Sequence, residues 1–154
     1  MAVSEGDEAP DFQLAIDGGG SIRLSDLKGR TVILYFYPND DTPGCTTEAI
    51  DFTSALPEFE AAGATVIGIS PNTIESHQKF KAKHGLGVML ASDPDHKALE
   101  PYGAWGEKMM YGRTTVGVIR STVMVGPDGR VARVWPRVRV KGHVDKVLEA
   151  VRAL

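Results

Sequence analysis

Two uninterrupted apolar runs place the strongest constraint on how this chain can fold. Residues 31–37 read TVILYFY, and residues 64–70 read ATVIGIS. Neither run alternates as a strand with one solvated face would, so both fit strands covered on two sides. A helical segment of about 15 residues separates them, which predicts a parallel strand pair joined by a crossover helix.

Two turn sequences are each flanked by short segments of residues that favour β-strands. Residues 12–16 and 21–24 surround an Asp-Gly-Gly-Gly turn, and residues 119–125 and 131–135 surround a Gly-Pro-Asp-Gly turn. Each arrangement predicts a β-hairpin.

Three further helices are expected. Residues 72–83 begin with Asn72 and Glu75, spaced as in a capping box, and Gly85 ends the helix. Asp93 followed by proline predicts the start of a short helix. The last helix has one apolar stripe, consisting of Val144, Val147, Leu148, Val151 and Leu154.

Residues 103–117 (GAWGEKMMYGRTTVG) show no period and predict a long loop. Loops of this length inside compact domains are often functional. Trp105, Met109, Met110 and Tyr111 could line the mouth of a site or form a docking surface, and plain packing under the loop fits them equally well.

The order of elements predicts an α/β fold with a mixed sheet, parallel first and antiparallel at the end. A thioredoxin-like architecture with an N-terminal β-hairpin and helices flanking the sheet fits this order, although the pattern alone allows others. The length of 154 residues predicts a single domain over residues 1–154.

Charge and composition exclude several classes of function. Seventeen Lys and Arg against twenty Asp and Glu give a net charge of −3, which does not suggest a nucleic-acid-binding protein. The N-terminus lacks the pattern of a signal peptide, and no apolar run is long enough to span a membrane. We therefore expect a cytoplasmic protein that contacts neither nucleic acid nor membrane.

No cofactor or metal site is expected. His77, His84, His96 and His143 are scattered without metal-ligand spacing, and we predict that they lie at the surface. The glycines at 18–20 do not lead from a strand into a helix, so they do not form a dinucleotide-binding motif.

Cys45 is the only cysteine, which excludes an internal disulfide, a Cys-x-x-Cys oxidoreductase motif and a cysteine-based zinc site. Thr42 is a good N-cap and Pro43 suits the first helical position, so Cys45 falls in the first turn of the crossover helix. It begins an inward apolar stripe that continues with Ala49, Phe52, Leu56 and Phe59.

This position gives Cys45 two possible roles. A lone cysteine on an apolar stripe is commonly a small buried hydrophobe. At a helix N-terminus, however, free amides and the helix dipole stabilise a thiolate. The specialised Asp-Thr-Pro-Gly-Cys turn favours the reactive role.

The spacing Pro38-x-x-x-Thr42-x-x-Cys45 resembles the active-site motif of the peroxiredoxins. The longer YPNDDTPGCTTEA resembles the peroxiredoxin Q branch, also called bacterioferritin comigratory proteins. Further similar segments, in the same order along most of the chain, are GDEAPDFQL, VIGIS, YGAWGEK, GVIRST and GHVDKVLEAV.

The resemblance implies that Cys45 is the peroxidatic cysteine, which attacks a peroxide oxygen and becomes a sulfenic acid. It implies that Thr42 orients the peroxide and that the amides of Gly44 and Cys45 stabilise developing charge. Pro38 would shield the sulfur from water, a role compatible with simply ending the strand.

Arg120 is the second residue singled out by the resemblance, which implies a guanidinium beside the thiolate and the peroxide. From sequence alone, an arginine at an exposed strand end is the alternative. Glu48 is expected to orient this arginine or to be structural. Asp40 and Asp41 are expected to be solvated turn residues.

Ile50 stands where many peroxiredoxin Q proteins have a resolving cysteine, five residues after the peroxidatic one. The resemblance therefore implies a one-cysteine thiol peroxidase, monomeric or weakly dimeric, that reduces hydrogen peroxide and organic hydroperoxides. Thioredoxin, glutaredoxin or glutathione would recycle it. A peroxide sensor or relay is the alternative, and a binding module with an inert cysteine is a third.

Overall fold

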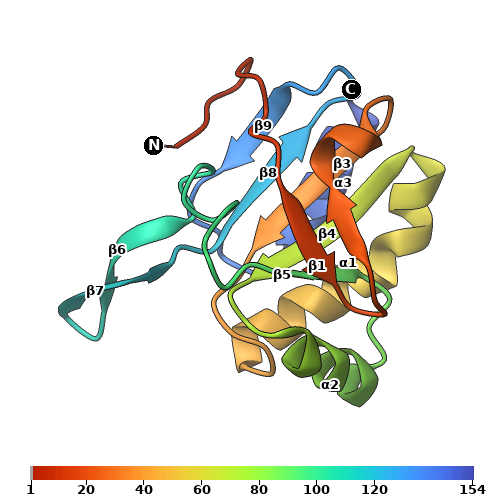
Figure 1. Ribbon diagram of the computed structural model, residues 1–154. Helices are drawn as coiled ribbons and strands as arrows, with labels where there is room; N and C mark the ends of the chain where they lie inside the picture. The colour runs from red at the N-terminus through yellow and green to blue at the C-terminus, as the bar shows by residue number, and fades with distance from the viewer. Residues whose placement is uncertain (1) are drawn as a thin grey trace.

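A seven-stranded mixed sheet forms the centre of the computed structural model, which describes residues 2–154 (Figure 1). The strands of this sheet are β1 (Gln13–Ile16), β2 (Ser21–Arg23), β3 (Thr31–Phe36), β4 (Ala64–Ser70), β5 (Met89–Ser92), β8 (Ser121–Val125) and β9 (Val131–Trp135). Their spatial order is β2-β1-β5-β4-β3-β8-β9. The predicted mixed α/β sheet and both predicted hairpins are confirmed.

Strands β3 and β4 pair in parallel, as their apolar sequences predict. Every residue of β3 is buried. Gly68 of β4 lies opposite Tyr35, and a Cβ at this position would come within 2.5 Å of the Tyr35 ring. Glycine therefore lets the aromatic ring lie flat against the neighbouring strand.

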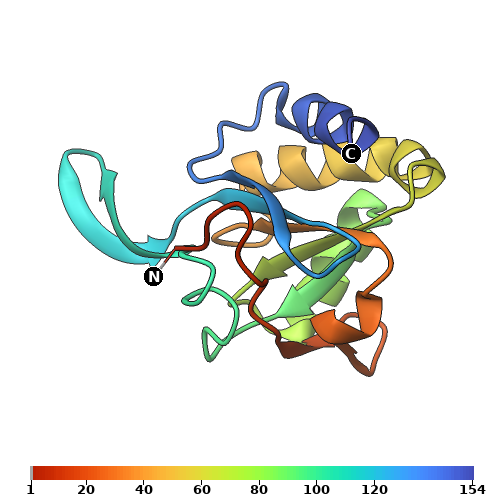
Figure 2. The ribbon, with the colours of Figure 1, turned by 90° about the horizontal axis from the view of Figure 1, so that it is seen from above.

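Three helices cover one face of the sheet: α1 (Pro43–Ala61), α2 (Ile74–His84) and α3 (His143–Arg152). Figure 2 shows α1 and α3 side by side on this face. The other face is covered by the N-terminal segment, the short 3-10 helix Leu24–Leu27 and the turns that precede residue 105. The sheet is thus buried on both sides, as its central strands require.

The sheet topology gathers several chain ends at one edge. Strand β8 is antiparallel to β3, and β9 is antiparallel to β8. The carboxyl ends of β3 and β9 and the amino end of β8 therefore lie at the same edge of the sheet. Helices α1 and α3 both begin at this edge, because each follows the carboxyl end of a strand.

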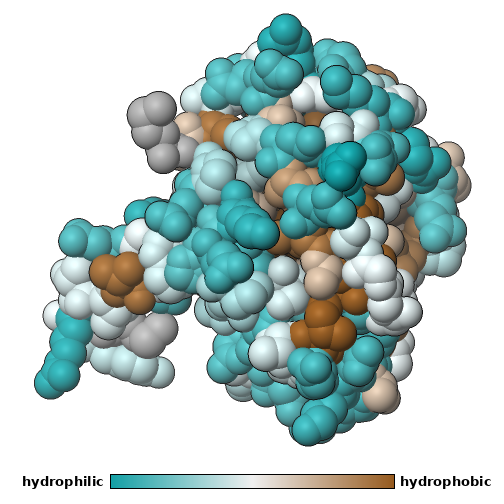
Figure 3. All heavy atoms as spheres, viewed as in Figure 1, coloured by the Kyte–Doolittle hydropathy of each residue, from teal (hydrophilic) through white to brown (hydrophobic). Residues whose placement is uncertain are grey.

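The loop predicted over residues 103–117 is wrong. This region forms an antiparallel hairpin of β6 (Trp105–Met110) and β7 (Arg113–Val118), which projects from the body of the protein (Figures 1 and 2). Figure 3 shows an apolar patch on this hairpin. Met109, Tyr111 and Val116 are exposed there. The segment lacks a clear strand period because most of it is solvated on both faces.

Several predicted helix boundaries also differ. Helix α1 has 19 residues rather than about 15. Helix α2 begins after Thr73, whose hydroxyl accepts the Ser76 N–H, so Asn72 is not its cap, whereas Gly85 ends the helix as predicted. Leu154 follows α3 and is exposed instead of completing the apolar stripe.

No helix forms at Asp93. Its carboxylate accepts the backbone N–H groups of Lys97, Ala98 and Leu99 and thereby organises a series of turns. Strand β5, just before Asp93, was not predicted from the sequence. Its four residues are too few for a clear period.

Candidate active site

Cys45 lies in the first turn of α1, at the sheet edge where β3 ends. Thr42 has an extended backbone at the N-cap, Pro43 follows it, and the Thr46 N–H donates to the Thr42 carbonyl at 2.8 Å. The Cys45 side chain is 1% exposed and begins the buried stripe with Ala49. The predicted cap residue and the inward face of the helix are both confirmed.

The guanidinium of Arg120 contacts the Cys45 sulfur. Arg120 immediately precedes β8, so it is not part of the strand expected over residues 119–125. Its Nη2 lies 3.2 Å from the Cys45 Sγ. A Cβ on Gly44 would lie 3.2 Å from the same nitrogen, so glycine leaves room for this approach.

Glu48 forms an ion pair with the other terminal nitrogen of the Arg120 guanidinium. Arg120 Nη1 donates to Glu48 Oε1 at 2.7 Å. The Arg120 side chain is 19% exposed and that of Glu48 is fully buried. Three residues singled out in the sequence thus lie together, because Arg120 contacts both Cys45 and Glu48.

The Glu48 carboxyl group is incompletely satisfied. Its Oε2 atom is buried and has no hydrogen-bond partner among the described residues. Burial raises the pKa of Glu48 to about 7, although Arg120 opposes this rise. Burial also disfavours the charged form of Arg120, but Glu48 and Cys45 outweigh it and raise the arginine pKa, so the guanidinium stays charged.

Thr42 and Pro38 border the same turn. The Thr42 hydroxyl donates to the Asn39 carbonyl at 2.7 Å and makes no cap bond to the helix. Its hydrogen is therefore used within the turn, while its lone pairs can still accept. Pro38 is half-buried between the end of β3 and the turn.

A buried cluster of polar side chains around Asp40 fixes the turn between β3 and α1. The sequence did not predict this cluster. Asp40 accepts from the Tyr37 hydroxyl at 2.6 Å and the Ser76 hydroxyl at 2.8 Å, and its Oδ2 lies 2.7 Å from His77 Nδ1. Asp40 is thus buried rather than solvated. Asp41 is exposed, as expected, and pairs with Lys83.

His77 is fully buried, which contradicts the predicted surface position. Its Nε2 faces the Ala91 carbonyl at 3.0 Å. Because a carbonyl only accepts, the contact with Ala91 places a hydrogen on Nε2. The spacing of His77 and Phe80, three residues apart on α2, could have indicated this inward face.

His143 is also buried, against the prediction. Its Nε2 lies 2.8 Å from the Thr122 hydroxyl. Burial lowers the pKa of His143 to about 4, with further contributions from Lys146 and Arg120. The ring is therefore neutral at physiological pH. His84 and His96 are partly exposed.

Ile50 lies one turn beyond Cys45 and is 41% exposed. Trp105, from the region predicted as a loop, stacks on His96 with ring centroids 3.8 Å apart. Tyr111 is 99% exposed and Met109 is 69% exposed. The Met110 side chain lies outside the described part of the structure.

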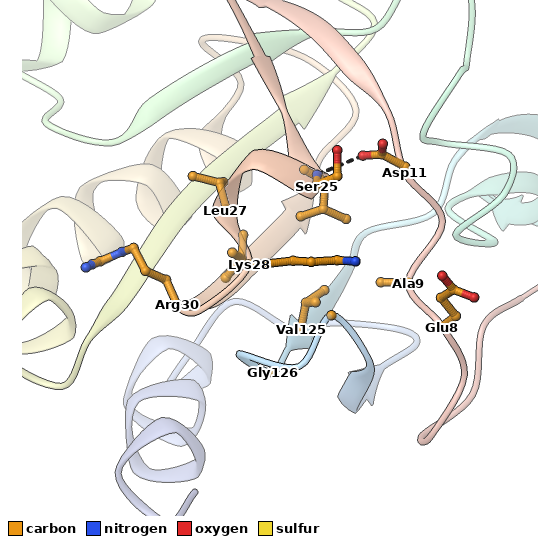
Figure 4. Close-up of a pocket in the computed structure, with 12 residues that line it drawn as sticks. Glu8, Ala9, Asp11, Ser25, Leu27, Lys28, Arg30, Val125 and Gly126 are labelled. Carbon is orange, nitrogen blue, oxygen red and sulfur yellow. Dashed lines mark hydrogen bonds between the residues drawn. The ribbon is translucent and has the colours of Figure 1, made fainter.

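A separate hollow of about 210 Å³ lies away from Cys45 (Figure 4). It includes Val32, at the beginning of β3, and Lys28, whose side chain extends across it toward Ala9. Asp11 at its rim accepts the Ser25 N–H. None of the predicted site residues lines this hollow.

Within residues 2–154, no group of three His, Cys, Asp or Glu side chains is arranged to hold a metal ion. The helices in this part of the chain are too short or too polar to cross a membrane.

Known proteins resemble this chain over almost its whole length. The AhpC/TSA family model matches residues 5–134. Peroxiredoxin Bcp of Bacillus subtilis is 42% identical over 152 residues, which cover 99% of this chain and 97% of that protein. The chain belongs to the peroxiredoxins, on their Bcp/PrxQ branch. Peroxiredoxins are thiol-dependent peroxidases, so the resemblance inferred from the sequence is confirmed at the level of family and enzyme class.

Other peroxiredoxins agree in sequence and fold. The putative peroxiredoxin bcp of Helicobacter pylori is 47% identical over 146 residues, covering 95% of this chain and 96% of the relative. Xanthomonas campestris peroxiredoxin Q superposes with a TM-score of 0.90 at 40% identity, covering 98% of this chain and 96% of that one. This likeness confirms the thioredoxin-like fold. The Xanthomonas protein has also been solved with two different cysteines each replaced by serine, whereas the present peroxiredoxin has only one cysteine.

Proposed function

We propose that this peroxiredoxin reduces hydrogen peroxide and organic hydroperoxides at Cys45 by a one-cysteine cycle. The contact between Arg120 Nη2 and Cys45 Sγ, at 3.2 Å, is the observation that supports this most directly. A charged guanidinium next to a buried sulfur at a helix N-terminus stabilises the anion that must attack. A solved bacterioferritin comigratory protein from Xanthomonas campestris, described for its alkyl peroxide reduction activity, supports organic hydroperoxides as substrates.

In the first step, the Cys45 thiolate attacks the nearer oxygen of ROOH. The S–O bond forms as the O–O bond breaks, the sulfur is oxidised to the sulfenic acid, and RO⁻ leaves as ROH after taking a proton. The amides of Gly44 and Cys45 and the guanidinium of Arg120 stabilise the charge that develops on the two oxygens.

Thr42 and Pro38 shape the substrate position. Because the Thr42 hydroxyl donates to Asn39, we assign Thr42 as the acceptor of the peroxide O–H. Pro38 keeps water from the sulfur on the side where β3 ends. Glu48 holds Arg120 in position from the buried side.

The thiol that reduces the Cys45 sulfenic acid comes from another molecule, because the chain has no second cysteine. Thioredoxin, glutaredoxin and glutathione are the candidate thiols, and the enzyme is proposed to act in the cytoplasm as a monomer or weak dimer. Ile50 offers no thiol to the sulfenic acid, so Cys45 is also expected to over-oxidise when peroxide exceeds the reductant.

A peroxide sensor or relay, which would pass oxidation from Cys45 to a partner protein, shares the same first step. Turnover distinguishes the two. We expect wild-type protein to consume many equivalents of peroxide with dithiothreitol, and Cys45→Ser to consume none. Oxidation by one equivalent without catalytic recycling by dithiothreitol, thioredoxin or glutaredoxin with glutathione would favour the sensor. Peroxide consumption by Cys45→Ser would exclude Cys45 as the reactive group.

A further inference from the structure

The segment that follows β9 concentrates positive charge at the edge of the sheet where Cys45 lies. Residues 136–146 contain four of the seventeen Lys and Arg but only one of the twenty acidic residues. This segment therefore carries +3 in a chain whose net charge is −3. Such a concentration of one sign creates a local field that attracts anions.

These cations surround a hollow. Val134, Trp135 and His143 form part of its wall, in a space of about 390 Å³. Four basic side chains also line it, namely Arg137, Arg139, Lys141 and Lys146, and no acidic residue does. Within residues 2–154 none of these four forms an ion pair, so their charge is available to a ligand.

The hollow adjoins the candidate active site through one hydrogen bond and one electrostatic interaction. The Val138 N–H donates to the Arg120 carbonyl at 2.9 Å, and the side chain of the same arginine reaches Cys45. His143, in the wall of the hollow, experiences the charges of both Lys146 and Arg120. The wall of the hollow thus contacts Arg120 through Val138, and His143 lies within electrostatic range of both Arg120 and Lys146.

We propose that this hollow binds the carboxylates of a small anionic thiol of the glutathione type, which then reduces the Cys45 sulfenic acid. The proposal rests on the proposed one-cysteine cycle and names the class of its reductant. The hollow falls within the size range of small-molecule sites. An extended tripeptide spans about 10 Å, long enough for its carboxylates to reach several of these cations.

The reductive steps balance without another reagent. The thiol sulfur attacks the Cys45 sulfur, an S–S bond forms and the S–O bond breaks, and the hydroxyl leaves as water with the thiol proton. A second molecule of the thiol gives up its proton to solvent and attacks the sulfur of the first in the mixed disulfide. The S–S bond to Cys45 breaks, the two thiols leave as their oxidised dimer, and the Cys45 thiolate is regenerated.

The test compares peroxide turnover with glutathione and with dithiothreitol, which carries no charge. The variant Arg137→Gln/Arg139→Gln/Lys141→Gln removes three cations from the hollow. We expect its KM for glutathione to rise roughly tenfold, because each exposed charge contributes a factor of about two. Its rate with dithiothreitol is expected to stay unchanged. The control, Lys28→Gln/Arg30→Gln/Arg152→Gln, removes the same charge at the other end of the sheet and is expected to match wild type with both thiols.

A measurement on the unaltered protein gives a second test. The KM for glutathione is expected to rise with salt, while that for dithiothreitol stays constant. An unchanged KM for glutathione in the hollow variant would overturn the proposal. So would a defect confined to an acidic protein reductant such as thioredoxin. Loss of turnover by wild type with every thiol would instead overturn the proposed peroxidase cycle, so the two failures are distinguishable.

Discussion

Two buried carboxyl groups, Asp40 before Cys45 and Glu48 after it, differ in how fully their hydrogen bonds are satisfied. Below the turn, the Asp40 carboxylate receives three side-chain partners, Tyr37, Ser76 and His77. Beside the sulfur, Glu48 has one bonded oxygen and one without a partner. A fully satisfied buried network favours a single structure, whereas burial raises the pKa of Glu48 to about 7 and so favours its neutral form.

This difference suggests that the two groups have separate roles, one in stability and one in catalysis. The Asp40 cluster joins the turn to α2 and β5 and is expected to determine stability. The Glu48–Arg120 pair contacts the reacting sulfur and is expected to determine rate. Substitutions in the Asp40 cluster should therefore change the free energy of unfolding, and substitutions in the Glu48–Arg120 pair should change the rate of peroxide reduction.

The largest effect is expected from Arg120→Met. This variant loses the charge beside the sulfur, so kcat/KM for peroxide should fall about 10³-fold, equivalent to about 4 kcal/mol. The free energy of unfolding should change by less than about 1 kcal/mol, because Glu48 can become neutral when its partner is gone. Stopped-flow peroxide reduction and urea unfolding measure the two quantities. A large loss of stability with an unchanged peroxide rate would show that the Glu48–Arg120 pair determines stability and not rate.

Asp40→Asn should show the opposite pattern. Asparagine keeps only one acceptor oxygen, so buried partners among Tyr37, Ser76 and His77 lose a hydrogen bond to a carboxylate. We expect the free energy of unfolding to fall by about 3 kcal/mol. The peroxide rate of the folded protein should fall by less than tenfold. The matched control is Asp41→Asn, whose carboxylate is exposed and paired at the surface, so its stability should stay close to that of wild type. Equal effects of the two substitutions would show that the buried cluster does not stabilise the turn.

Glu48→Gln should alter how stability depends on pH. The raised pKa means that the folded protein holds a proton more tightly than the unfolded chain, so Glu48 lowers stability as pH rises from 4.5 to about 7. His143 acts in the opposite sense, because its lowered pKa costs stability as pH falls from 6.5 to about 4. Each contribution is at most about 3 kcal/mol.

The two slopes largely cancel in wild-type protein over the window they share. In Glu48→Gln the slope from His143 remains alone, so stability should rise with pH by about 2 kcal/mol between pH 4.5 and 6.5. Denaturant unfolding at a series of pH values measures this. Parallel curves for wild type and Glu48→Gln would show that Glu48 does not titrate in this range.

Ile50→Cys should have the smallest effect on rate. Five residues of helix separate the two Cα atoms by a rise of about 7.5 Å, beyond the reach of a disulfide in an intact helix. We expect the first peroxide step to stay within about twofold of wild type and any internal disulfide to require opening of the first turns of α1. Peptide mapping after oxidation detects that bond. Rapid disulfide formation without loss of helix signal would contradict this geometry.

The sequence predicted those features that depend on local pattern. The parallel pair β3 and β4, the cap at Thr42 and the inward position of Cys45 follow from apolar runs and helix spacing. The contact of Arg120 with Cys45 came from the family resemblance, because no local pattern brings together residues 75 positions apart.

The features that the sequence did not reveal depend on tertiary contacts. Asp40 and His77 are 37 positions apart, and nothing near Asp40 distinguishes a buried carboxylate from a solvated one. The hairpin of β6 and β7 was missed because its residues do not alternate between a buried and a solvated face. Asp93 has the pattern of a helix cap, yet its carboxylate satisfies amides of turns instead.

Intact mass after one equivalent of peroxide tests the one-cysteine cycle most directly. Wild-type protein, oxidised without a thiol present and trapped with dimedone, should gain one adduct at Cys45, and glutathione added instead should give one mixed disulfide. Cys45→Ser should gain neither. A covalent dimer formed as fast as peroxide is consumed would contradict the account, because Cys45 would then be resolved by a second copy of the chain and not by an external thiol.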